Sequence, residues 1–278
     1  MKKILFVCTG NTCRSPMAAA IFRSLNPEFS VESRGLFADG SNYCQHSIDA
    51  LAEIGINLSG ASKQLTREDL SADFFFCMTE SHKQTLLSLG VEENKIIVLH
   101  IIDPYGQGLD TYKKCRDELK DKLSKYSFSI RLFGSEDAPA VAEIEKVCFS
   151  HPWSENTILE SFSANTIFFV CENGQGEIVG YAGLSRVLDE GYVTNIAVLP
   201  AFRGFHIGRR LVDALITYGK ENALSFITLE VRESNKAAIS LYEKAGFKQV
   251  GLRKNFYDSP KENAILMTRE FMYDNSCN

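Results

Sequence analysis

The chain has 278 residues, which is long for one compact domain and ordinary for two. Hydrophobic residues make up 45% of it and charged residues 23%, the composition of a soluble globular protein. The formal net charge of −5 argues against a nucleic-acid partner, whose usual footprint is basic, and no apolar run approaches the roughly 20 residues that span a bilayer.

The first half of the sequence alternates apolar runs with amphipathic segments. We expect strands at residues 3–7, 29–35, 73–78 and 96–99, and helices at residues 16–25, 47–53, 80–89 and 110–125. This alternation predicts an α/β domain with a doubly wound parallel sheet that helices cover on both faces. The first apolar stretch ends at Thr9, too soon for a secretory leader, so we interpret it as a buried strand and expect a cytoplasmic protein.

The pattern restarts after residue 127, which predicts one domain over residues 1–127 and a second over residues 128–278. A strand at 128–133 and a helix at 135–149 precede strands at 166–172, 178–187 and 192–198. A helix at 208–220, a strand at 226–232, a helix at 236–245 and strands at 248–254 and 264–271 follow. This order predicts a mixed α/β domain.

The most informative segment of the first half is CTGNTCRSPMA, from Cys8 onwards, between an expected strand and an expected helix. Successive backbone N–H groups of such a loop surround one point and, with the helix N-terminus, bind a phosphate dianion. Gly10 and Asn11 best tolerate the left-handed backbone that such a loop needs, and Arg14 adds a bidentate clamp. We expect the cradle to consist of Thr9, Gly10, Asn11, Thr12, Cys13 and Ser15.

The same field stabilises a thiolate, so Cys8 is the candidate nucleophile of a C-x5-R-S signature. Ser15 can donate its hydroxyl to that sulfur. The reaction also needs a general acid, which protonates the leaving group and later activates water. Asp103 in the loop after the last strand is the candidate, although an Asp-Pro pair alone would be only a turn signal.

Residues 1–126 resemble the low-molecular-weight phosphatase family in the strings VCTGNTCRSPMA, SRGLFA, DFFFCMTESHKQ and DPYGQGLDTYKKCRDEL and around His46. The resemblance implies that Cys8 attacks phosphorylated protein substrates to form a cysteinyl-phosphate, with Arg14 as clamp and Asp103 as acid. Tyrosine-directed members usually carry a larger aliphatic residue at the position of Thr12, whereas bacterial protein-arginine phosphatases carry Thr. The resemblance therefore implies phosphoarginine or phosphotyrosine as substrate.

The spacing of the cysteines argues against a zinc site and leaves one redox question open. The eight cysteines show neither a CxxC repeat nor a Cys/His ligand spacing, so no metal is expected. An arsenate reductase-like first domain is an alternative, but it would need further thiols near Cys77, and none follows closely. We interpret Cys13 as the partner of a reversible disulfide with Cys8, with simple loop packing as the alternative.

The second half contains another strand–loop–helix segment, residues 195–209, whose loop presents backbone donors suited to a pyrophosphate. Through the strings HPWSE, TNIAVLP, TLEVRESNKAAISLYEKAGF and RKNFY, residues 128–274 resemble the GNAT acetyltransferases. Their closest likeness is to the ribosomal-protein-alanine N-acetyltransferases, which acetylate a protein N-terminus. The resemblance implies acetyl-CoA as co-substrate, held by Ile196, Ala197, Val198, Arg203, Gly204, Phe205, His206, Ile207, Gly208 and Asn235.

The resemblance also implies Glu230 as general base for the substrate amine and Tyr242 as general acid for the CoA thiolate. From the residues alone, Glu230 could be a solvated strand residue and Tyr242 a core aromatic. His206 stands where the family loop normally has glycine, so its Cβ is expected to weaken acetyl-CoA binding. The leading hypothesis is a bifunctional enzyme, and the alternative is an active phosphatase with a degenerate acetyl-CoA-binding regulatory module.

Overall fold

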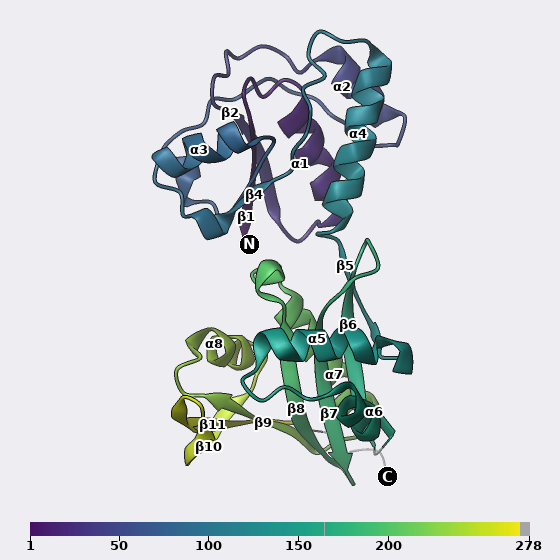
Figure 1. The fold of residues 1–278 in the computed structure, drawn as a ribbon, viewed down its shortest axis with the longest axis vertical. Helices are drawn as coiled ribbons and strands as arrows, with labels where there is room; N and C mark the ends of the chain where they lie inside the picture. The colour runs from purple at the N-terminus through teal and green to yellow at the C-terminus, as the bar shows by residue number, and fades with distance from the viewer. Residues whose placement is uncertain (164, 273–278) are drawn as a thin grey trace. The chain divides into compact units, whose positions relative to one another are not determined.

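The chain forms two compact units, Met1–Ser127 and Phe128–Asn278. The computed structural model describes residues 1–163 and 165–272 (Figure 1). Within those ranges, no helix has both the length and the apolar character needed to cross a membrane.

The first unit is built on a four-stranded parallel sheet in the order β2-β1-β3-β4. Its strands are β1 (Lys3–Cys8), β2 (Ser30–Gly35), β3 (Phe74–Cys77) and β4 (Ile96–Val98). Its helices are α1 (Arg14–Leu25), α2 (Gln45–Ala52), α3 (Glu80–Ser88) and α4 (Leu109–Ser124), with short 3-10 turns η1 (Glu68–Ser71) and η2 (Glu93–Lys95). The predicted parallel α/β fold is confirmed.

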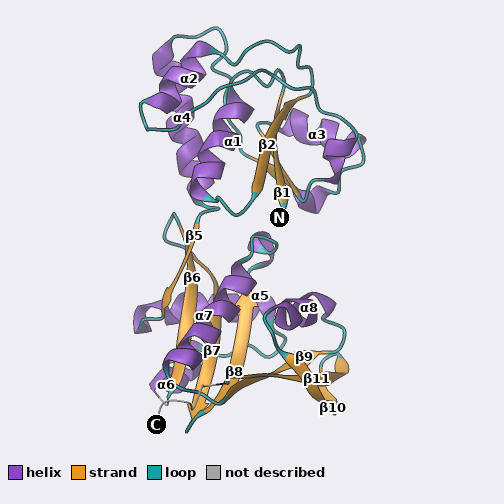
Figure 2. Ribbon diagram, turned by 180° about the vertical axis from the view of Figure 1, so that it is seen from behind, coloured by secondary structure: helices purple, strands orange, loops and turns teal. Residues whose placement is uncertain are grey.

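Helices lie on both sides of this sheet, with α1 and α4 together on one side and α3 on the other (Figures 1 and 2). The interior strand β1 is buried on both faces. On one, Phe6 stacks on Phe76 with ring centroids 4.9 Å apart and meets Phe22 of α1 at 5.5 Å. On the other, Leu5 and Val7 belong to a cluster that includes a leucine of α3. Burial on both faces explains why β1 is apolar from Ile4 to Cys8 rather than alternating.

The second unit contains one mixed sheet in the order β10-β11-β9-β8-β7-β6-β5. Its strands are β5 (Phe128–Leu132), β6 (Thr166–Asn173), β7 (Ile178–Val187), β8 (Glu190–Val198), β9 (Phe226–Arg232), β10 (Lys248–Asp258) and β11 (Lys261–Glu270). Its helices are α5 (Ala138–Cys148), α6 (Glu155–Ser163), α7 (Ile207–Glu221) and α8 (Lys236–Lys244), with 3-10 turns η3 (Ser135–Asp137) and η4 (Pro200–Phe202). Helix α5 covers one face of the sheet and α7 the other (Figures 1 and 2).

The parallel pair β8 and β9 stays together only at its start. β9 pairs with Glu190–Tyr192 of β8, whereas β7 pairs with β8 as far as Val198. Beyond Tyr192 the two strands diverge (Figure 2). Within the described chain, the β9-facing edge of residues 193–198 therefore has no strand partner. This open edge leads directly into the loop before α7.

Three details differ from the sequence-based expectations. Helix α6 was not predicted, although Ser154 caps it by accepting a hydrogen bond from the Thr157 N–H at 3.1 Å. The helix expected at 135–149 is a 3-10 turn followed by α5. β10 continues past residue 254 to Asp258, because a register irregularity, with Asn255 at φ 52°, interrupts the strand pattern without ending the pairing.

Candidate active sites

The phosphate loop of the first unit, residues 9–13, connects the end of β1 to the start of α1. It lies on the segment after β2, where the N–H groups of Leu36 and Phe37 donate to the carbonyls of Cys8 and Thr9 at 3.0 and 2.9 Å. A Cβ on Gly35 would come within 2.8 Å of the Thr9 carbonyl oxygen. Gly35 must therefore be glycine for the loop to pass, a role that sequence reasoning missed.

Asn11 fixes the shape of this loop. Its φ of 55° confirms the expected left-handed conformation, whereas the same expectation for Gly10 was wrong, since Gly10 does not have a positive φ. The buried Asn11 amide donates to Ser15 Oγ and Ser33 Oγ, both at 2.9 Å. Its oxygen accepts the Lys63 N–H at 2.8 Å. One polar side chain thus ties the loop to α1, β2 and a distant segment.

Cys8 lies at the bottom of the loop with 3% of its surface exposed. Its sulfur accepts the Asn11 N–H at 3.3 Å and is 3.0 Å from Ser15 Oγ. Ser15 also receives a hydrogen bond from Asn11, and its own proton can point either at the sulfur or at the Arg34 carbonyl, 3.4 Å away. These donors stabilise negative charge on sulfur, as a nucleophilic thiolate requires.

The structure brings Cys8, Arg14 and Asp103 into one cavity of ≈ 470 Å³. Arg14 is buried and forms an ion pair with the half-exposed Asp103 carboxylate. Arg14 also donates to the Ile101 carbonyl at 3.3 Å, and Asp103 accepts the Tyr105 N–H at 3.2 Å. The expected clamp and the expected acid therefore hold each other in place at the cavity wall. The other lining residues are Thr9, Gly10, Thr12, Cys13, Phe37, Asp39, Ser41, Asn42, Cys44 and Tyr105.

Two thiols beside the cavity share one tyrosine. The Tyr112 hydroxyl lies 3.3 Å from Cys13 Sγ and 3.2 Å from Cys44 Sγ. Neither Cys44 nor Tyr112 was identified from the sequence, because both approach the loop only through tertiary packing.

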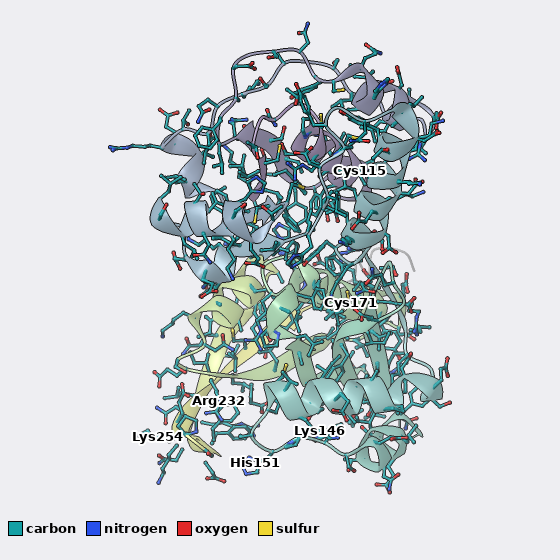
Figure 3. All side chains as sticks on the ribbon, turned by 45° about the horizontal axis from the view of Figure 1, so that its top comes forward. Cys115, Lys146, His151, Cys171, Arg232 and Lys254 are labelled. Atoms are coloured by element: carbon teal, nitrogen blue, oxygen red, sulfur yellow. The ribbon has the colours of Figure 1, made fainter. Side chains whose placement is uncertain are left out.

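The remaining thiols of the described chain are mostly buried and inert. Burial raises the pKa of Cys77, Cys115 and Cys171 to about 12 (Figure 3 labels the last two). Such thiols stay protonated near neutral pH and are poor nucleophiles. This supports the argument against arsenate reduction through Cys77. The last cysteine, Cys277, lies outside the described residues.

In the second unit, the expected cofactor loop joins the open edge of β8 to the N-terminus of α7. Gly204 and His206 both have left-handed backbones, with φ 90° and 61°, and His206 is the N-cap of α7. His206 thus adopts the conformation that glycine favours. Arg203 donates to the Val198 carbonyl at 3.0 Å, which ties the loop back to the strand.

Two features near the expected acetyl-CoA residues suit that ligand. Ile196, Ala197 and Val198 lie on the part of β8 that β9 does not pair with, and the backbone groups left open on that edge can bond an extended amide-containing arm. The Val198 carbonyl already accepts the hydrogen bond from Arg203. The first N–H groups of α7 suit a pyrophosphate. Asn235 instead caps α8, where its Oδ1 accepts the Ala238 N–H at 3.2 Å. Its predicted contact with the co-substrate stays a prediction.

Glu230 on β9 and Tyr242 on α8 share an ionisable neighbour, Tyr257. Glu230 Oε1 lies 3.2 Å from Arg253 Nη2, an ion pair that the sequence did not predict. Burial raises the pKa of Tyr242 to about 12. Tyr257 interacts electrostatically with both candidates, and its ring lies 4.1 Å from the guanidinium of Arg232, labelled in Figure 3.

A buried carboxylate also supports β8. Glu145 of α5 is fully buried and accepts hydrogen bonds from the Tyr181 hydroxyl, from Asn195 Nδ2 at 2.8 Å and from the Trp153 N–H at 2.7 Å. Glu145 therefore fixes Asn195, which lies in β8 directly before the expected acetyl-CoA-binding residues 196–198. The sequence pattern of α5 did not single it out, because the partners come from three separate segments.

Comparison with known proteins assigns the two units to different families. The family model described as low molecular weight phosphotyrosine protein phosphatase matches residues 3–132, and that of the acetyltransferase (GNAT) family matches residues 138–247. The protein-arginine-phosphatase of Bacillus subtilis is 38% identical over 144 residues, spanning 46% of this chain and 96% of its own length.

Two relatives resemble the second unit. The [ribosomal protein bS18]-alanine N-acetyltransferase of Haemophilus influenzae is 40% identical over 135 residues, spanning 47% of this chain and 90% of its own length. The crystal structure of the ribosomal-protein-S18-alanine N-acetyltransferase from Escherichia coli is 33% identical, with a TM-score of 0.50, and covers 53% of this chain and 97% of that one.

Proposed function

The chain belongs to the low molecular weight phosphatase family through its first unit and to the GNAT acetyltransferases through its second, and on this premise we propose that it dephosphorylates proteins and acetylates a protein N-terminus. The first activity rests on Cys8, whose sulfur accepts the Asn11 N–H, lies 3.0 Å from Ser15 Oγ and shares a cavity with Arg14. The second rests on the open edge of β8 beside the start of α7. We also propose that the chain works in the cytoplasm, whose reducing environment keeps a nucleophilic thiol such as Cys8 reduced.

In the proposed phosphatase reaction, Cys8 Sγ attacks phosphorus and forms an S–P bond while the bond to the substrate nitrogen or oxygen breaks. Arg14 turns from Asp103 to the phosphoryl oxygens as the substrate binds, and Asp103, which enters this step protonated, gives its proton to the leaving group. Arg14 and the loop N–H groups hold the phosphoryl oxygens in which charge develops. Asp103 then accepts a proton from water, which attacks phosphorus, and Ser15 stabilises the departing Cys8 thiolate.

Phosphoarginine is the substrate that the cavity favours. Thr12 lines the cavity, and the B. subtilis relative of this unit is named as an arginine phosphatase. Asp39 also lines the cavity and, among the described residues, has no cationic partner. Phosphoarginine carries a negative phosphate and a positive guanidinium. The phosphate can pair with Arg14 and the guanidinium with Asp39, because both residues line the cavity. Phosphotyrosine offers no positive group to Asp39.

The test of this function is phosphate release by the full-length chain from matched phosphoarginine and phosphotyrosine peptides, with Cys8→Ser as the inactive control. We expect Cys8-dependent release, faster from phosphoarginine. Preference for phosphotyrosine would keep the mechanism and remove the substrate assignment. Absence of Cys8-dependent release from either peptide would contradict the phosphatase proposal itself.

We expect Asp39→Asn to reduce the preference for phosphoarginine over phosphotyrosine by roughly two- to fivefold, the effect of one exposed charge pair. The preference is measured as the ratio of the kcat/KM values for the two peptides. Hydrogen bonds from Ser41 lower the pKa of Asp39. A lowered pKa keeps the carboxylate charged as pH falls, so the preference should persist into weakly acidic buffer. Glu28→Gln, which removes the same charge at an exposed position outside the cavity, is the matched control.

In the proposed acetyl transfer, acetyl-CoA supplies an acetyl group on a thioester. Glu230 accepts a proton from the substrate ammonium, directly or through water, so that the free amine can attack. Arg253 must release Glu230, at least in part, for this to occur. Tyr242 holds its proton at neutral pH, because its pKa is raised, and can give it to the leaving thiolate.

The left-handed backbone at His206 supports an intact co-substrate loop over a degenerate module. Such a conformation costs a non-glycine residue about 1–2 kcal/mol. We therefore expect His206→Gly to stabilise the second unit by about 1 kcal/mol in denaturant unfolding and to tighten acetyl-CoA binding a few-fold in calorimetric titration. Leu188→Gly, also at a left-handed position (φ 56°), should stabilise the unit without changing affinity.

If the chain with His206→Gly and the wild-type chain both fail to bind acetyl-CoA, the acetyltransferase proposal is wrong. If both bind it but no peptide N-terminus is acetylated, the regulatory-module alternative is favoured instead.

A further inference from the structure

Three thiols line the same cavity of the first unit, and only Cys8 has a role in the proposed reaction. The others, Cys13 and Cys44, come from segments 31 positions apart in number, yet both sulfurs contact the Tyr112 hydroxyl, at 3.3 and 3.2 Å. The two sulfurs are thus within two hydrogen-bond lengths of each other. Cys8, Cys13 and Cys44 therefore form a cluster of three thiols around one cavity.

The backbone holds this cluster together. Cys13 is the N-cap of α1 and Cys44 is the N-cap of α2. The Cys44 N–H donates to the Thr12 carbonyl at 3.0 Å, which joins the two chain segments directly beside both cysteines. The thiolate is the form of a cysteine that attacks a disulfide. Cys44 is partly exposed, so it can react without unfolding of the unit.

We propose that Cys44 completes a thiol relay that moves an oxidative disulfide away from the nucleophile. Hydrogen peroxide oxidises the Cys8 thiolate to a sulfenic acid with release of hydroxide. The Cys13 thiol condenses with that sulfenic acid, which forms the Cys8–Cys13 disulfide and releases water. The Cys44 thiolate then attacks Cys13 Sγ, the Cys8–Cys13 bond breaks, and Cys8 leaves as a thiolate. The net product is a Cys13–Cys44 disulfide and a regenerated nucleophile.

The surroundings of the sulfurs set the direction of the last step. Tyr112 holds Cys44 beside Cys13, so Cys13 Sγ is the sulfur within reach of attack. Exchange is fastest when the leaving sulfur is the better-stabilised thiolate. Cys8 receives the Asn11 N–H and faces the Ser15 hydroxyl, whereas burial raises the pKa of Cys13. Expulsion of Cys8, and not of Cys13, is therefore the favoured outcome.

The experiment treats the full-length chain with a short pulse of hydrogen peroxide, blocks free thiols by alkylation and locates disulfides by mass spectrometry, with phosphatase activity measured in parallel. We expect the wild-type chain to carry Cys13–Cys44 and to keep most of its activity. We expect Cys44→Ser to carry Cys8–Cys13 and to lose about tenfold or more of its activity until dithiothreitol is added. Cys115→Ser, which alters a buried thiol of the same unit outside the cavity, should behave like the wild type.

The relay would be overturned if the main product in the wild-type chain were a Cys8–Cys13 disulfide, a Cys8–Cys44 disulfide or a Cys8 sulfinic acid. Equal loss of activity in the wild type and in Cys44→Ser would do the same. Turnover of each variant is measured first under reducing conditions, to show that its cavity is folded. If Cys44→Ser is not folded by this criterion, Cys44→Ala replaces it. The relay rests on the proposed phosphatase only for its activity readout. Absent turnover in every reduced sample would contradict the phosphatase, whereas the disulfide map still tests the relay.

Discussion

Cys8→Ser is expected to lower phosphate release by at least about 10³-fold, since loss of a covalent nucleophile has effects of this size or larger. A serine hydroxyl fits the space of the thiol and can keep the contacts to Asn11 and Ser15. It does not ionise near neutral pH, so the loop donors have no anion to stabilise before attack. The measurement is single-turnover phosphate release from a phosphoarginine peptide.

The second unit supplies the control in the same sample. Acetyl transfer by the Cys8→Ser chain should match that of the wild-type chain and so report concentration and folding. Cys171→Ser, the same chemical change at a buried thiol of the second unit, should leave phosphate release within about twofold of wild type once a native circular dichroism spectrum is shown. Residual release above a tenth of wild type in Cys8→Ser would mean that another group attacks phosphorus.

The sequence predicted those parts of the first site that lie in one short segment. Cys8 to Ser15 form a strand–loop–helix connection whose function follows from local spacing, and Asn11 has the left-handed backbone that its residue type suggested. What could not be predicted depends on distant segments. The fit of Gly35 under Thr9 and the Arg14–Asp103 ion pair require the packed fold. A local pattern carries no information about which loops meet it.

The second unit shows the same division. Strands with clear apolar patterns were predicted within a few residues, whereas α6 was missed. This helix is short, and among its described residues Ile158 is the one fully buried hydrophobic side chain. The separation of β8 from β9 was also out of reach, because strand pairing is set by tertiary contacts. That separation is the feature that creates the expected acetyl-CoA edge.

Tyr242→Phe is expected to lower kcat for acetyl transfer by about 10²-fold, the lower end of general acid effects, with little change in the KM for acetyl-CoA. Phenylalanine keeps the ring that packs 5.9 Å from Phe247, so only the hydroxyl is lost. Because burial raises the pKa of Tyr242 to about 12, this residue stays protonated through the assay range. The wild-type rate should therefore show no loss from Tyr242 ionisation below about pH 11. Initial rates across pH, with an alanine-initiated peptide, give both values.

Tyr218→Phe on α7 is the matched control. The Tyr218 ring packs against Phe169, with ring centroids 6.4 Å apart, and it has no proposed role in the reaction. Phosphate release by the same samples measures the concentration of folded chain. A Tyr242→Phe rate within twofold of wild type would mean that Tyr242 serves only as a buried aromatic residue of the core. The proton for the thiolate would then have to come from Tyr257 or from water. A 10²-fold loss confined to kcat instead requires a proton donor that acts in the transition state, since a packing defect would also change co-substrate binding or stability.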